Sequence, residues 1–208
     1  MNEQLILGSN TVQDIAADGE GYARQDNSGA LILSDLLGYE SARRSSIFTA
    51  NTAVTGVAPG TSIGTTAAFA LQNPDAGTKW LVILEASMGY VSGTLGAGCI
   101  HWVGHVPGVD FSGTAITEYS SRMGSGTAEG VALTTATVPS GGTLLRLFGS
   151  TGASLASTAV APWRLQDKVD GRIIVPPGYG ISIQGTTAAG STPLVVYSVT
   201  WAEILIPS

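Results

Sequence analysis

The sequence lacks several features that would place a protein in a common class. Among its 208 residues there is a single cysteine, Cys99, which excludes an internal disulfide framework and a zinc site built from several cysteines. Nine basic residues stand against fifteen acidic ones, so the formal net charge is −6. A chain of this charge, without a basic patch, is not expected to bind nucleic acid, either DNA or RNA.

Features of membrane and secreted proteins are missing as well. No apolar run approaches the roughly 18 residues that a transmembrane helix needs. Residues 1–4 provide neither the positive charge nor the apolar core of a signal peptide. We therefore expect a soluble protein that is made in a cytoplasm and has no membrane partner.

Long charged side chains are scarce, and small residues take their place. Lysine occurs only twice, at Lys79 and Lys168, whereas glycine, alanine, serine and threonine occupy 96 positions. Solvated helix faces are normally built from Glu, Lys, Gln and Arg, while Gly, Ser and Thr are typical of short strands and turns. An apolar fraction of 44% with 12% charged residues excludes the disordered class. The composition predicts a folded protein rich in β-strands.

The charge is distributed unevenly along the chain. Residues 1–45 contain seven acidic and three basic residues, a net charge of −4, whereas residues 46–208 contribute only −2. The first segment has one compact apolar stretch, residues 30–37, which is too short to form a core by itself. We therefore divide the chain into an N-terminal arm, residues 1–45, and a body, residues 46–208. The arm orders against its own body or a neighbour, unless it is an ordinary first strand and loop; both interpretations stay open.

The body contains short apolar stretches separated by turn-forming residues. Gly, Pro, Asn and Asp cluster every 8 to 15 residues, a spacing typical of antiparallel sandwiches and jelly rolls. The clearest hairpin is predicted at residues 172–184, with its turn at Pro176 to Gly180. We predict an all-β fold, an antiparallel jelly-roll-like β-sandwich with an N-terminal extended arm. The expected strands cover residues 47–57, 65–72, 79–87, 99–106, 115–121, 131–138, 144–148, 172–175, 181–184 and 194–206.

Residues 60–64 match the G-x-S-x-G pattern of a hydrolase nucleophile elbow. In a chain so rich in Gly and Ser, this match carries little information. An elbow also needs a buried strand before it and a helix after it. Here Pro59 precedes the motif and a strand-like stretch follows it, so we interpret the motif as a turn.

The cysteine and both histidines are close in sequence, at Cys99, His101 and His105. On a strand the three side chains share one face, but the outer two stand about 20 Å apart, too far for one tetrahedral ion. The H-x-H pair of a cupin-type enzyme is absent. We therefore predict no metal and no other cofactor, and interpret this stretch as a surface or subunit-facing strand.

Carboxylates are candidates for glycoside hydrolysis, because a pair of them can serve as acid and base. Glu203 lies between the large apolar residues Trp201 and Leu205, where burial would raise the pKa of a catalytic acid. A strand end whose carboxylate meets a loop or an arginine explains the same position. We favour this second interpretation and predict no catalytic residues and no enzyme. The other carboxylates of the body that we considered are Asp110, Glu118, Glu129, Asp167 and Asp170.

Four tryptophans could offer stacking platforms for sugars. Trp80, Trp102 and Trp201 lie in apolar strand patterns and are predicted core residues. Trp163 follows Pro162 in a loop-like stretch. It is therefore the best exposed candidate for contact with a sugar or a protein partner.

The C-terminal residues carry a resemblance to known proteins. Residues 175–183 read V-P-P-G-Y-G-I-S-I, and residues 195–204 read V-V-Y-S-V-T-W-A-E-I. A P-P-G-x-G-I-x-I hairpin followed by a V-x-W-x-E-I closing strand resembles the jelly-roll virion proteins of tailed bacteriophages, especially the capsid cement, or decoration, proteins. The matching text covers about 35 residues, and the rest of the chain agrees in composition only.

This resemblance implies a structural virion protein on the outside of a phage capsid, made in the host cytoplasm. It implies a homo-oligomer, commonly a homotrimer, that bridges neighbouring major capsid proteins through its N-terminal arm. An arm can add to exposed strand edges through main-chain hydrogen bonds, and oligomerisation turns several weak attachments into a durable one. The predicted partner-binding residues are Leu31, Ile32, Leu33, Leu36, Leu37, Arg43, Arg44 and Trp163.

Two other classes of function stay open. A phage head-fibre or tail module that binds a receptor or glycan would use similar strands, with Trp163 as its predicted contact. A glycan-cleaving enzyme would need the carboxylates considered above. We favour the cement protein over both.

Overall fold

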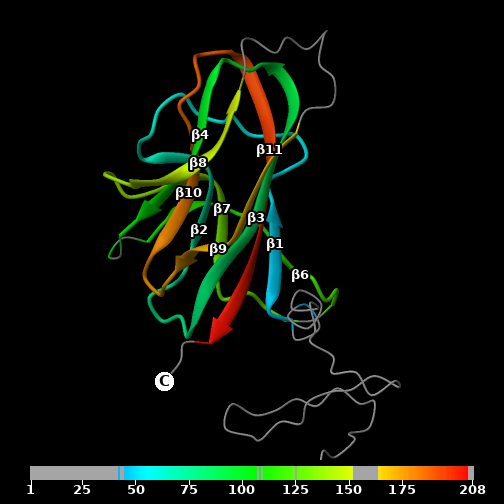
Figure 1. The fold of residues 1–208 in the computed structure, drawn as a ribbon, viewed down its shortest axis with the longest axis vertical. Helices are drawn as coiled ribbons and strands as arrows, with labels where there is room; N and C mark the ends of the chain where they lie inside the picture. The colour runs from blue at the N-terminus through cyan, green and yellow to red at the C-terminus, as the bar shows by residue number, and fades with distance from the viewer. Residues whose placement is uncertain are drawn as a thin grey trace, which may run out of the picture. The chain divides into compact units, whose positions relative to one another are not determined.

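Two antiparallel β-sheets pack face to face as a sandwich in the described part of the chain (Figure 1). The computed structural model describes residue 42 and residues 45–106, 108, 110–124, 126–151 and 164–205. The predicted all-β class and the β-sandwich are therefore confirmed. Within these ranges, no helix has the length and apolar character that a membrane crossing requires. The strands are β1 (Ile47–Asn51), β2 (Thr66–Gln72), β3 (Lys79–Thr94), β4 (Gly98–His105), β5 (Ser112–Ala115), β6 (Glu118–Ser120), β7 (Val131–Thr137), β8 (Thr143–Thr151), β9 (Arg164–Val175), β10 (Gly180–Gly185) and β11 (Ser191–Leu205).

The two sheets are defined by the order of their hydrogen-bonded strands. Sheet I has the order β6-β1-β11-β3-β9, and sheet II has the order β5-β7-β2-β10-β4-β8. The strands β5, β6 and β7 all lie between β4 and β8 along the chain. When these three are set aside, the chain changes sheets at every step except from β4 to β8, with β1, β3, β9 and β11 in sheet I and β2, β4, β8 and β10 in sheet II.

The core fills the space between the sheets. In β11 every second side chain faces the core, and Tyr197, Val199 and Trp201 are fully buried. Phe48 of β1 stacks on Trp201, with the ring centroids 6.1 Å apart. Trp102 of β4 is fully buried as well, so two of the three tryptophans predicted in the core are confirmed.

The prediction that Trp80 belongs to the core is wrong. In β3 the fully buried residues include Leu81 and Ile83, so Trp80 lies on the other face of sheet I and is only half-buried. A register shift between Ile83 and Glu85 then changes the alternation, and Ala86 faces the core. Both faces of this strand are apolar, and sequence periodicity alone does not reveal which one the second sheet covers.

The hairpin predicted at residues 172–184 does not form. β9 pairs with β3 in sheet I, whereas β10 pairs with β2 and β4 in sheet II. The turn between them carries the chain from one sheet to the other. Within it, the Tyr179 amide donates to the Pro176 carbonyl at 3.1 Å, and the Gly178 amide donates to the Asn73 carbonyl at 2.9 Å. Turn residues show where a chain reverses, but they do not identify the strand it pairs with.

The single strand predicted at residues 115–121 is divided between the sheets. Its first residue ends β5 in sheet II, and its last residues form β6 in sheet I. Between the two strands Ile116 is buried in the core, and its amide donates to the Ala132 carbonyl at 2.9 Å. The chain therefore passes from sheet II to sheet I with the Ile116 side chain in the core.

Candidate interaction surface

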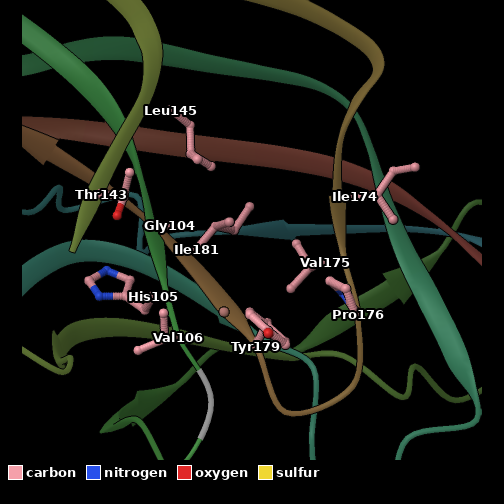
Figure 2. Close-up of a pocket in the computed structure, with 11 residues that line it drawn as sticks. Gly104, His105, Val106, Thr143, Leu145, Ile174, Val175, Pro176, Tyr179 and Ile181 are labelled. Carbon is pink, nitrogen blue, oxygen red and sulfur yellow. The ribbon is translucent and has the colours of Figure 1, made fainter.

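A cavity lies between β9 of sheet I and the strands β4, β8 and β10 of sheet II (Figure 2). Its volume is about 200 Å³, and it opens to the surface. Leu145, Val175 and Ile181 contribute apolar side chains from three different strands. The cavity is therefore a product of both sheets and is suited to an apolar group.

Four large apolar residues that line this cavity are also well exposed. The exposed fractions are 68% for Val106, 46% for Leu145, 50% for Ile174 and 41% for Tyr179. We call these four residues the cavity rim. An exposed cluster of large apolar side chains around a hollow is typical of a surface that another protein covers.

Local sequence explains how the floor of the cavity forms. The Pro-Pro-Gly-Tyr-Gly stretch makes the crossing turn, in which Gly178 has a φ of 82°, a conformation that favours glycine. At Gly180 a Cβ atom would lie 2.3 Å from the ring of Phe111. Glycine at this position therefore lets Phe111 pack closely against the start of β10.

His105 contributes to the cavity wall, but its ring is directed elsewhere. In Figure 2 the ring turns away from Leu145 and Ile181. Its Nε2 atom lies 2.8 Å from the Ser182 hydroxyl, and both residues are buried. The Gln184 amide donates to the same hydroxyl at 2.9 Å. This serine is fully buried, so the pair fills an interior position and offers no exposed nucleophile.

Burial also determines the charge state of His105. The loss of solvent around the ring lowers the pKa of His105 below its ordinary value of 6.5, and the nearby Pro139 main chain opposes this shift only in part. The neutral imidazole is therefore the form that the fold favours.

The two histidines contact different residues. His101 Nε2 lies 3.0 Å from the Thr186 hydroxyl, whereas His105 contacts Ser182. The structure describes no group of three or more His, Cys, Asp or Glu side chains that could hold a metal ion. In this region the two histidines instead connect β4 to β10 and to the residues that follow it.

Glu203 is a structural carboxylate in the described contacts. Its Oε1 accepts hydrogen bonds from the amides of Glu129 and Gly130 at 2.7 and 3.0 Å. Its Oε2 accepts from Lys79 Nζ at 2.9 Å, and the carboxylate itself is fully buried. The prediction that this carboxylate contacts a loop is confirmed. The cation beside it is Lys79, whereas an arginine was expected from the sequence as the alternative to the loop.

Most of the other body carboxylates that were considered as catalytic candidates also hold segments together. Glu129 Oε1 accepts from the Thr78 amide at 2.6 Å, and Glu118 Oε1 accepts from the Ala132 amide at 2.8 Å. Asp110 accepts from the Gln72 side chain at 3.1 Å. Asp170, by contrast, is exposed on β9.

The G-x-S-x-G segment lies where the interpretation as a turn expects it. Residues 61–65 form a bend, Gly60 has a φ of 87°, and β2 follows directly. The Gly64 amide donates to the Gln184 side chain at 2.9 Å. A strand follows the serine where an elbow would have a helix.

The residues that the sequence assigns to partner binding are not among those described. Leu31, Ile32, Leu33, Leu36, Leu37, Arg43, Arg44 and Trp163 all lie outside the described residues. The same holds for the predicted arm, residues 1–45, apart from residues 42 and 45.

The cavity rim, by contrast, was not singled out from the sequence. One signal was present, because Leu144 and Leu145 are adjacent in a predicted strand, where an apolar pair breaks the usual alternation. Such a pair places apolar side chains on both faces of an edge strand.

Comparison with known proteins gives no match: no protein family model, no curated protein and no solved structure is significantly similar to this chain.

Proposed function

We propose that the protein is a structural virion protein that binds the outside of a phage capsid and bridges neighbouring major capsid subunits. The observation that carries the proposal is the cavity rim, an exposed apolar surface of the kind that subunits bury on association. The C-terminal resemblance to capsid cement proteins supplies the class of partner. In this proposal the copies of the protein assemble with one another through the body, residues 46–208.

The hydrogen bonds of the carboxylates support a structural role over a catalytic one. Glu203 and Asp167 each accept bonds from several donors of the protein itself. A general acid or base must reach substrate, and these two groups are buried and fully engaged. The hydrogen bonds of these two carboxylates therefore stabilise the sandwich.

The strand order supports the finer description of the fold. We propose that β1-β11-β3-β9 and β2-β10-β4-β8 are the two four-stranded sheets of a jelly roll. The chain changes sheets between consecutive strands at every step except from β4 to β8, and this pattern favours the arrangement. In this proposal β5, β6 and β7 are an insertion between the fourth and fifth strands.

The N-terminal arm, residues 1–45, is the proposed capsid contact. An extended arm can pair with an exposed strand edge of the capsid lattice through main-chain hydrogen bonds. A single arm gives modest affinity, but several arms on one oligomer bind together, because the first attachment raises the effective concentration of the others. The homotrimer that the resemblance implies would present three such arms.

A capsid-binding measurement tests this proposal. The full chain is mixed with purified phage capsids that lack it, and cosedimentation and the temperature of capsid rupture are measured. The protein should sediment with the capsids and raise that temperature. A variant with Leu33→Asp and Leu36→Asp should keep its own oligomeric mass and lose binding, whereas Leu205→Asp, at a 70% exposed position of the body, should bind normally. Absence of binding by the unmodified protein would contradict the proposal.

A further inference from the structure

Met123 is the most exposed large apolar side chain in the described part of the chain. Its exposed fraction is 94%. It lies in the turn that follows β6, next to Gly124, whose φ of 79° belongs to a tight reversal. A methionine held at the tip of a turn in this way is a protruding apolar group, which the described residues leave almost uncovered.

The protruding methionine and the cavity lie at opposite edges of sheet I. β6 is one edge strand of that sheet, and β9, which lines the cavity, is the other. A contact that joins the two features must therefore come from two different copies of the chain. Copies placed edge to edge would bring the β6 turn of one subunit toward the cavity of the next.

The sizes of the two features are compatible. A dry cavity of about 150 Å³ in a protein can hold benzene, which has six heavy atoms. The cavity here has about 200 Å³, and a methionine side chain contributes four heavy atoms. Methionine also adapts its shape to irregular apolar hollows, because it is unbranched and has three rotatable bonds.

The geometry points to a head-to-tail assembly of this protein, in which Met123 of one subunit inserts into the cavity between β8 and β9 of the next. Because the two contacting surfaces differ, the interface is heterologous, and such interfaces close into rings when the rotation between subunits permits. The inference extends the oligomer part of the proposed function and does not depend on capsid binding.

Charge around the cavity favours this arrangement over a twofold contact of two cavity rims. Three exposed cations lie on β9, at Arg164, Lys168 and Arg172, and none forms an ion pair with a described residue. Of the three, Arg172 is nearest the cavity rim, two residues before Ile174 on the same strand. Two exposed carboxylates offset part of this charge, at Asp170 on β9 and at Glu85 on β3, which is the cross-strand partner of Lys168. A twofold contact of two rims would bring Arg172 close to its own copy, which costs free energy. At the β6 edge one cation, Arg122, stands with one carboxylate, Glu118.

Two single substitutions of the full chain separate the two halves of the contact. Met123→Asp removes the protruding group and leaves the cavity intact. Leu145→Asp places a charge at the cavity rim and leaves the methionine intact. Mass is measured in solution without capsids, and circular dichroism checks that each variant is folded.

The expected result is an unmodified protein with three or more subunits and two monomeric single variants. Mixing the variants should then produce a one-to-one dimer, because the Leu145→Asp subunit still has its methionine and the Met123→Asp subunit still has its cavity. The dimer cannot grow further, since its two remaining surfaces are the altered ones. The matched control is Val54→Asp, at an 87% exposed position away from both surfaces, which should keep the full oligomer.

Three outcomes would overturn the inference. A monomeric or dimeric unmodified protein would show that no head-to-tail ring forms. A Met123→Asp variant that keeps the mass of the unmodified protein would show that the methionine is not the contact; since this side chain is almost fully exposed, the substitution has no packed neighbours to disturb. Folded single variants that stay monomeric when mixed would show that the two surfaces do not bind each other. A failure of capsid binding alone would leave these masses unchanged and would count only against the proposed function.

Discussion

Trp102 and Asp167 form a hydrogen bond that joins the two sheets inside the sandwich. The Trp102 indole Nε1 on β4 donates to Asp167 Oδ2 on β9 at 2.9 Å, and both side chains are buried. Arg146 of β8 forms an ion pair with the other carboxylate oxygen at 2.7 Å. One carboxylate thus connects the edge strand of sheet I with two strands of sheet II.

Loss of the Asp167 charge should destabilise the fold measurably. We expect Asp167→Asn to lower the free energy of unfolding by about 2 kcal/mol, because an amide accepts on one side only and leaves Trp102 or Arg146 without its charged acceptor. Urea denaturation checks this value. Asp170→Asn on the same strand is the control, since Asp170 is exposed and asparagine tolerates its φ of 49°. Equal effects of the two substitutions would contradict the prediction.

Glu203→Gln should weaken the attachment of the loop before β7. The substitution keeps an oxygen for the amides of Glu129 and Gly130, but it removes the charge that faces Lys79. We expect a loss of about 1 to 3 kcal/mol in the free energy of unfolding, the range for hydrogen bonds to charged groups. Amide hydrogen exchange at residues 129 and 130 should accelerate as well.

The matched control for this prediction is Glu85→Gln. Glu85 lies on the exposed face of β3, where its carboxylate accepts from Gln166 at 3.0 Å. An exposed contact of this kind contributes little, so the change should stay within about 0.5 kcal/mol. A Glu203→Gln variant as stable as Glu85→Gln would refute the structural role of the buried carboxylate.

The stability of the fold should decrease at acidic pH because of His105. Burial lowers the pKa of His105 below 6.5, so the unfolded chain binds this proton more readily than the folded one. The neutral His105 ring therefore contributes to the free energy of unfolding. This contribution is fully present above pH 6.5 and is lost as the pH falls from there through the lowered pKa of His105 in the folded state. Urea denaturation at a series of pH values between about 7.5 and 5 measures the slope. His105→Gln should reduce this slope, and an unchanged slope would remove His105 as its source.

Gly180→Ala should destabilise the crossing turn between the sheets. A Cβ atom at this position would lie 2.3 Å from the Phe111 ring, so the ring must move out of its packed position. We expect a cost of about 1 to 3 kcal/mol in thermal or urea unfolding, as for other overpacked sites. Gly89→Ala is the control, because a Cβ at Gly89 meets nothing within 4 Å. That substitution should leave stability unchanged or raise it slightly, since alanine loses less backbone entropy than glycine on folding.

Strand positions could largely be predicted from the sequence, because each strand is a local pattern. The alternation in β11 and the apolar stretch of β4 are visible in consecutive residues, and both strands lie within a few residues of their predicted bounds. The loop contact of Glu203 could also be anticipated, since a carboxylate among apolar neighbours needs donors nearby. Its particular donors could not, because Glu129 and Gly130 lie more than 70 residues away in the chain.

Strand pairing and the faces of the strands could not be predicted in the same way. β9 and β10 are consecutive and joined by a short turn, yet they belong to different sheets. Trp80 and Leu81 are both apolar, and only the position of sheet II decides which of them is covered. The cavity rim is a similar case, because it joins residues from β8, from β9 and from the turns beside β4 and β10.

The sequence by itself therefore determined the all-β class, most strand positions and the contrast between an acidic N-terminal segment and a weakly charged body. These properties depend on composition and on periodicities of a few residues, which are present in the unfolded chain as well. Only the tertiary structure decided which strands pair, which apolar faces are buried and where the apolar cavity and the protruding Met123 lie relative to each other. Those relationships depend on contacts between residues far apart in the chain, and such contacts exist only once the two sheets have packed.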